Sequence, residues 1–107
     1  MDAASELVVF ITAGDAEEAE RIAEAVVRER LAACVSITGS VRSIYRWQGA
    51  VEKAEESLLI IKTTRGTFDA LARRIRELHS YEAPEIIALP VVAGDADYLR
   101  WLRENVG

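Results

Sequence analysis

Apolar residues recur along this chain with two spacings that alternate in a regular order. Residues 6–12 form a short, nearly continuous apolar run rich in β-branched side chains, which predicts a strand buried on both faces and central in a sheet. After Gly14 the apolar positions change to helical spacing as far as about residue 31, and Asp15 and Glu18 have the spacing of a capping box. The expected helix has one buried face, made of Ala19, Ile22, Ala23 and Val26.

The middle of the chain has the pattern of a long β-hairpin. Residues 34–47 are extended, with apolar side chains of one parity, and Gly39 among them favours a bulge. Gln48-Gly49 suits a two-residue turn, after which residues 50–65 return as a second strand. The apolar second half of this strand belongs in the core. Its first half is expected to project beyond the core because it is charged, through Glu52, Lys53, Glu55 and Glu56.

The remaining residues predict a helix, a strand and a last short helix. The second amphipathic helix is indicated by the spacing of Phe68, Leu71, Ile75 and Leu78. Pro84 prevents this helix from continuing, residues 85–92 predict a fourth strand, and Pro90 suits an edge position. Asp95 is the expected cap of the C-terminal helix. The order β-α-β-β-α-β predicts an α+β, ferredoxin-like fold, in which two helices pack on one face of an antiparallel sheet.

Composition limits the function classes that fit this chain. The 107 residues predict a single domain, residues 1–107, with one core. The net charge of −5 argues against nucleic acid as a partner, because phosphate backbones need a basic surface. Neither an N-terminal signal nor an apolar run of about 18 residues is present, so no membrane association and a cytoplasmic location are expected. The one cysteine, Cys34, excludes an intrachain disulfide.

The length of the hairpin predicts self-association. Two strands of about 14 residues span roughly 45 Å, whereas a domain of this size has a radius of gyration of about 13 Å. The hairpin should therefore extend beyond the core and hold the rings of Tyr45 and Trp47 in water. Because an isolated two-stranded ribbon is marginally stable, packing against neighbouring copies is the economical solution.

Several sequence strings resemble one known family in both order and spacing. They are ERLAACV at 29–35, SIYRWQG at 43–49, LLIIKTT at 58–64, HSYEAPEI at 79–86 and YLRWL at 98–102. Together they cover nearly the whole chain and are similar to the CutA divalent-cation-tolerance family. One departure is Ser80, where the family usually has proline between histidine and tyrosine.

This resemblance implies a ferredoxin-like subunit that assembles as a homotrimer through its long hairpin, similar to the PII signalling proteins. It also implies a cytoplasmic protein of copper and divalent-metal tolerance, with no reaction attached to it. In some members copper binding is ascribed to cysteine and histidine ligands, for which this chain offers Cys34 and His79.

A metal site and a small-ligand pocket are both open interpretations of the candidate residues. Cys34 and His79 suit Cu(II) or another divalent ion, and Glu85 or Glu82 can add an oxygen ligand. One cysteine and one histidine make an incomplete site. Each residue also has a purely structural explanation. Cys34 can be a small buried residue at the start of a strand, and His79 can interact with the dipole at a helix C-terminus.

The pocket alternative places a small molecule or anion at a subunit boundary, as in a PII-like effector module. Its candidate residues are Lys62, Tyr81, Glu85, Tyr98 and Trp101, with Lys62 expected to pair with Glu85. Packing of the last helix on the sheet is the alternative explanation of Tyr98 and Trp101, and for Trp101 it is the favoured one. An enzyme is not expected, because the acidic loop 12–16 lacks the arginine of a phosphate-hydrolysing ferredoxin-like enzyme and no nucleophile accompanies Glu82 and Glu85.

Overall fold

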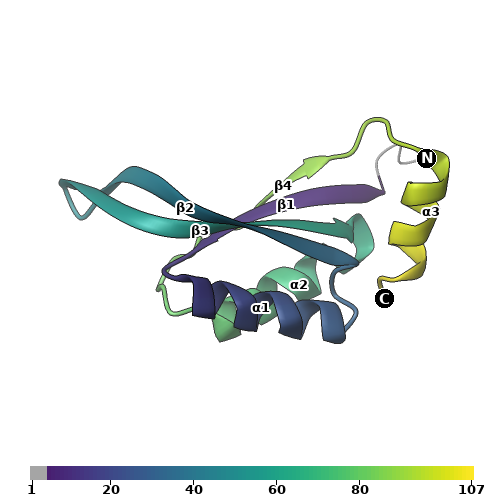
Figure 1. Ribbon diagram of the computed structural model, residues 1–107, viewed down its shortest axis with the longest axis horizontal. Coiled ribbons are helices and arrows are strands. Elements are labelled where there is room, and N and C mark those ends of the chain that lie inside the picture. The colour runs from purple at the N-terminus through teal and green to yellow at the C-terminus, as the bar shows by residue number, and fades with distance from the viewer. Residues whose placement is uncertain (1–4) are drawn as a thin grey trace.

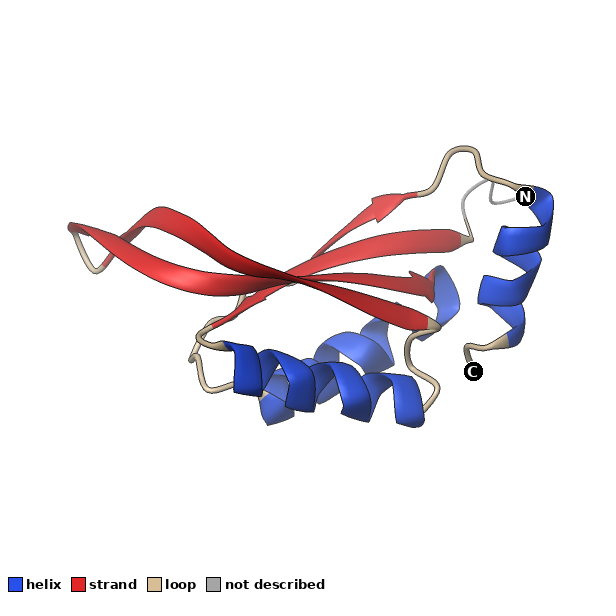
Figure 2. Cartoon of the chain, viewed as in Figure 1, coloured by secondary structure: helices blue, strands red, loops and turns tan. Residues whose placement is uncertain are grey.

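A computed structural model of the chain describes residues 5–107, and it confirms the predicted order of elements (Figure 1). A four-stranded sheet is covered on one face by two helices, while a third helix lies at the end of the sheet remote from the hairpin tip (Figure 2). This is the predicted α+β, ferredoxin-like arrangement. The elements are β1 (Glu6–Ala13), α1 (Ala16–Arg28), β2 (Cys34–Trp47), β3 (Ala50–Thr64), α2 (Arg65–Leu78), β4 (Ile87–Pro90) and α3 (Ala96–Glu104).

The sheet has the strand order β2-β3-β1-β4, and all its pairings are antiparallel. The first strand is central, as predicted, with Val9 opposite Ile61 of β3 and Ala88 of β4. Only one of its faces is fully buried, however. Alternate residues such as Val8 and Phe10 are half-buried, because α1 and α2 cover the other face.

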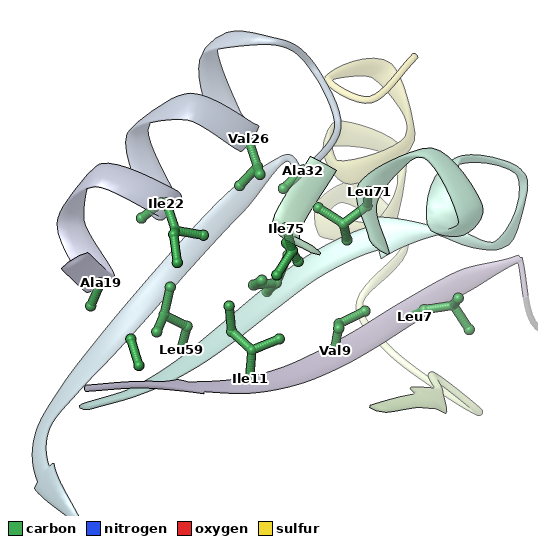
Figure 3. Close-up of a cluster of buried hydrophobic side chains, with 13 residues drawn as sticks. Leu7, Val9, Ile11, Ala19, Ile22, Val26, Ala32, Leu59, Leu71 and Ile75 are labelled. Atoms are coloured by element: carbon green, nitrogen blue, oxygen red, sulfur yellow. The ribbon is translucent and has the colours of Figure 1, made fainter. Parts of the chain in front are cut away.

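The core lies between the sheet and the two covering helices (Figure 3). Alternate residues of β1 and β3 project toward the helices, as the two-residue period of a strand requires. Burying these branched side chains provides most of the favourable free energy of folding. Central members of the core are Val9, Ile11, Ile22, Val26, Leu59, Ile61, Leu71 and Ile75.

The start of α1 follows the predicted signal, and its end comes earlier than expected. The Asp15 carboxylate accepts a hydrogen bond from the Glu18 N–H at 2.8 Å. The helix ends at Arg28 rather than near residue 31, because Arg30 adopts a positive φ of 61° that turns the chain out of the helix. The Leu31 N–H then bonds back to the Val26 carbonyl.

The hairpin of β2 and β3 is as long as predicted, with strands of 14 and 15 residues. Gln48 and Gly49 both have positive φ, which is the conformation of a tight hairpin turn. The register shifts between Thr38 and Val41, so the bulge expected near Gly39 is present. The hairpin stretches the molecule to 43 × 25 × 23 Å, and Figure 1 shows its tip extending beyond both helices.

The fourth strand is shorter than the predicted 85–92 and covers only Ile87–Pro90. It pairs with β1 from Phe10 to Leu7, and beyond Leu7 the partner strand approaches its own start. Residues Glu85 and Ile86 instead belong to the connection from α2, which passes beside the hairpin. No helix among residues 5–107 combines the length and apolar character needed to cross a membrane.

Candidate functional site

The part of the hairpin that extends beyond β1, from Glu56 to Trp47 beside the turn, and the connection after α2 enclose an open cavity of about 650 Å³, hereafter called the cavity at the hairpin root. Three segments that are separate in the sequence form its wall. They are the end of β1, the outer half of β2 with one residue of β3, and the connection to β4. The long hairpin supplies one wall because it extends past the point where β1 ends. Its lining residues are Thr12, Ser43, Ile44, Tyr45, Trp47, Glu56, Tyr81, Glu82, Ala83 and Glu85.

A hydrogen bond between Tyr81 and Glu56 joins two walls of this cavity. The Tyr81 hydroxyl donates to Glu56 Oε2 at 2.8 Å. The Glu56 residue is only 7% exposed, so the expectation that it projects into water with the rest of the charged strand is wrong. The hydrogen bond from Tyr81 offsets part of the desolvation cost of burying the Glu56 carboxylate. Burial and the hydrogen bond to Glu56 both raise the pKa of Tyr81.

A buried carboxylate on α1 holds the connection after α2 in place. Glu18 accepts hydrogen bonds from the Ser80 N–H at 2.7 Å, from the Ser80 hydroxyl at 3.1 Å and from the Gly14 N–H at 3.3 Å. Burial acts to raise the pKa of Glu18, but these hydrogen bonds outweigh it and lower the pKa overall. Of the predicted capping box, the described contacts contain only the bond from the Glu18 N–H to Asp15, because the Glu18 side chain binds Gly14 and Ser80 instead.

His79 is fully buried beneath this connection, with a partner at each ring nitrogen. Its Nε2 lies 2.7 Å from the Thr12 carbonyl oxygen, and its Nδ1 accepts from the Tyr81 N–H at 3.0 Å. These partners require the tautomer with the proton on Nε2. Glu18 Oε2 lies 3.5 Å from Nδ1, and the Tyr81 ring is 4.6 Å from the imidazole between centroids. The imidazole therefore positions Tyr81, and neither nitrogen has a free lone pair for a metal.

Cys34 lies far along the sheet from the end of β1 that His79 contacts. Its cross-strand partner is Lys62, which also stands opposite Val8, whereas His79 contacts Thr12 at the other end of β1. The Cys34 Sγ lies 3.6 Å from the Tyr98 hydroxyl. This contact and burial raise the pKa of Tyr98.

The predicted site residues thus fall into two groups. Tyr45, Trp47, Tyr81 and Glu85 line the cavity at the hairpin root. The second group lies near α3 and consists of Cys34, Lys62, Tyr98 and Trp101. Tyr98 and Trp101 stack at 5.5 Å and are each partly exposed. The expected ion pair of Lys62 with Glu85 is not formed in the described chain, because the two residues belong to different groups.

The described residues do not form a complete metal centre within one chain. Across residues 5–107, no three histidine, cysteine or acidic side chains converge as metal ligands. Cys34 and His79 are separated, and the imidazole is already engaged at both nitrogens. A divalent ion can find oxygen ligands at Glu85 and Glu82, which lie on the open side of the cavity. A ligand from another molecule is needed to complete such a site.

Several site residues were not predicted from the sequence. The sequence pattern places Glu56 in the charged part of the hairpin and indicates no role for Thr12, Ser43 or Ile44, all of which line the cavity. One available signal was the pairing register. The 15-residue β3 lies opposite the eight-residue β1, so the β3 residues before Ser57 have no β1 neighbour, and another segment can cover them.

The sequence is similar to proteins of one described family. A profile for the CutA1 divalent ion tolerance protein matches residues 7–105. The divalent-cation tolerance protein CutA of Thermus thermophilus is 53% identical over 102 residues, which cover 95% of this chain and 99% of that protein. The chloroplastic protein CutA 1 of Oryza sativa is 41% identical over 99 residues, which cover 92% of this chain and 56% of the rice protein. This chain therefore spans little more than half of the rice relative.

The fold of this chain is also similar to solved structures of the same family. The divalent cation tolerance protein of Thermus thermophilus superposes with a TM-score of 0.94 over 95% of this chain and 99% of that one, at 53% identity. CutA1 from Oryza sativa superposes with a TM-score of 0.94 over 98% of this chain and 96% of that one, at 39% identity.

Proposed function

The chain belongs to the CutA1 divalent ion tolerance family, and from this premise we propose that it serves divalent-cation tolerance as a homotrimer assembled through its long hairpin. The metal, Cu(II) or another divalent ion, is bound at the subunit boundary. The protein acts by binding and assembly rather than by catalysis. The observation that carries this proposal is the carboxylate-bearing cavity at the root of a hairpin that extends beyond its own core.

Exposed apolar side chains on the hairpin support assembly. Ile44 is 67% exposed and Val51 is 61% exposed, and the rings of Tyr45 and Trp47 also face solvent in the isolated chain. Such a surface is typical of a region that another molecule covers. The sheet ends on one side at the long edge strand β2, whose outer hydrogen-bonding groups are available to a neighbour.

Metal binding in this proposal depends mainly on Glu85. Of the three predicted metal ligands, Glu85 lines the cavity, whereas Cys34 is remote from it and His79 is engaged with Thr12 and Tyr81. Carboxylates bind divalent ions without the need for a thiolate. A neighbouring copy supplies the remaining ligand across the subunit boundary.

Native mass spectrometry with and without Cu(II) tests assembly and metal binding in one experiment. We expect a three-chain species at low micromolar concentration and an added mass of bound metal on that species. Glu85→Gln is expected to keep three chains and lose metal. The matched control is Glu20→Gln, which removes an exposed charge from α1. A single-chain species would overturn the assembly, and full retention of metal by Glu85→Gln would overturn the proposed ligand.

A second candidate function is a PII-like module that binds a small effector in the same cavity. The observation in its favour is the size and character of the cavity, since about 650 Å³ and two exposed rings suit an organic molecule better than a single ion. A cytoplasmic location is part of either proposal. The chloroplastic name belongs to the rice relative.

A further inference from the structure

We propose that the cavity at the hairpin root binds an organic cation, namely an ammonium or guanidinium group on a flat apolar body. This inference rests on the second candidate function, the effector-binding module, and names its ligand class. It is carried by the charge of the cavity wall, by its rings and by the mostly buried Glu56 carboxylate, whose second oxygen still reaches solvent.

All ionised side chains that line the cavity have the same sign. Glu56, Glu82 and Glu85 supply three carboxylates, and the described residues that line the cavity include no lysine, arginine or histidine. An anionic ligand would therefore be repelled, and a neutral one would leave the carboxylates without a counter-charge. The acidic cavity wall therefore favours a positively charged ligand.

Glu56 differs from the other two carboxylates of the lining in its burial. Its residue is more than nine-tenths buried, yet its one hydrogen-bond donor among the described residues is the neutral phenol of Tyr81, which contacts Oε2. The other oxygen, Oε1, is not sealed off from solvent, because the described residues contain no fully buried side-chain oxygen that lacks a partner, and Glu56 lines the cavity. A carboxylate removed from water to this extent is stabilised by a charged donor. A ligand N–H group supplies one.

The rings specify the body of the ligand. Tyr45 is 44% exposed and Trp47 is 42% exposed, and both line the cavity with Tyr81. Cations bind favourably over the faces of such rings, and flat apolar groups stack on them. The carboxylates do not converge as a metal cluster would, whereas an organic cation can reach dispersed groups with separate N–H donors.

A guanidinium group can also come from an arginine of a second copy of this chain, since the hairpin itself carries Arg42 and Arg46. We assign the site to a free molecule, because the cavity is larger than one arginine side chain fills. Native mass spectrometry distinguishes a free ligand from an arginine of a second copy.

The test is a calorimetric titration of the assembled protein with three isosteric ligands: benzamidinium, neutral benzamide and anionic benzoate. A Trp101→Phe background leaves Trp47 as the single tryptophan, so its fluorescence reports binding at the cavity. We expect saturable binding of one benzamidinium per chain, at least about tenfold tighter than benzamide or benzoate. Glu56→Gln, which can still accept from Tyr81, should weaken benzamidinium binding about tenfold or more.

Glu20→Gln is the control for loss of an acidic charge on the surface, and it should leave the affinity unchanged. Equal binding of the three ligands would overturn the proposal, as would wild-type affinity in Glu56→Gln. Where Glu56→Gln fails to fold by circular dichroism, Glu82→Gln provides the same comparison on an exposed lining residue.

Native mass spectrometry of the same samples separates this inference from the proposed function. Benzamidinium bound to an intact oligomer supports the free-ligand site, whether or not the protein binds metal. Binding only after the oligomer dissociates would overturn it and assign the cavity to a second copy's arginine. An oligomer that binds metal but does not bind benzamidinium would support the metal proposal and overturn the cation site.

Discussion

The hydroxyl of Tyr81 lies 2.8 Å from Glu56 Oε2 and joins the connection after α2 to the root of the hairpin. The two residues are 25 positions apart in the sequence and come from segments that do not pair in the sheet. The same tyrosine is held on its other side, because its N–H donates to His79 and the rings of the two residues are in contact. Tyr81 therefore connects the buried polar residues beneath the cavity to the cavity wall.

Tyr81→Phe should destabilise the protein by about 1–3 kcal/mol, the range for leaving a buried polar group without its partner. The phenylalanine fills the same space but removes the donor to Glu56. Urea unfolding at pH 7 measures the difference in the free energy of unfolding. Tyr98→Phe is the control, since among residues 5–107 its hydroxyl has only the long contact to Cys34, at 3.6 Å, and a smaller loss is expected. Equal losses in the two variants would contradict a special role for the Glu56 contact.

The stability contributed by Glu18 should depend on pH. Its pKa is lowered from the ordinary value of 4.5 by hydrogen bonds from Ser80 and Gly14, which outweigh the effect of burial. A lowered folded-state pKa means that the stabilisation is complete above the unfolded value and is lost as pH falls through the folded value. Glu18→Gln should therefore be less stable than wild type by about 1–3 kcal/mol at pH 7.

The difference between Glu18→Gln and wild type should shrink below about pH 4.5. Unfolding curves at several pH values between neutral and about pH 3 measure this convergence. Glu20→Gln, on the exposed side of the same helix, should track wild type throughout. A Glu18→Gln deficit that is constant with pH would assign the loss to packing rather than to the carboxylate.

The fold was predictable because most of its determinants are local. The turn at Gln48-Gly49, the cap at Asp15 and the bulge near Gly39 each depend on a few neighbouring residues. Strand and helix periods then limit the topology to very few arrangements. The boundaries that were wrong depend on distant contacts: the fourth strand ends where β1 begins, and α1 ends at the positive φ of Arg30.

The candidate site was less predictable, because its contacts join segments that are remote in sequence. Tyr45, Trp47, Tyr81 and Glu85 were identified by residue type alone, and the structure gathers them into one cavity. The ligand roles of His79 and Cys34 depend on what their side chains touch. Both ring nitrogens of His79 are engaged with backbone groups, a fact that no spacing in the sequence reveals.

Glu85→Gln should weaken divalent-metal binding at least about tenfold, the loss that even an outer-shell partner produces. His79→Gln should leave the metal affinity unchanged, because the imidazole has no free lone pair in the folded chain. Isothermal titration with Cu(II) compares the variants with wild type. A thermal melt of each variant, recorded first, shows that the comparison is made on folded protein. Weaker binding in a folded His79→Gln and not in Glu85→Gln would reverse this assignment and restore the histidine as the ligand.

Val51→Asp should convert the oligomer to single chains while leaving the subunit folded. Val51 is 61% exposed on the hairpin and does not line the cavity, so its substitution separates assembly from ligand binding. Burying a valine in an interface contributes about 1.5–3 kcal/mol, and an aspartate there adds the penalty of desolvating a charge in each subunit. Analytical ultracentrifugation gives the mass, and circular dichroism reports the fold. Val27→Asp is the matched control, since Val27 is partly exposed on α1, beside Val35 at the start of β2 and away from the hairpin tip, and should leave the oligomer intact. An unchanged oligomer in Val51→Asp would show that the subunits associate through some other surface than the hairpin.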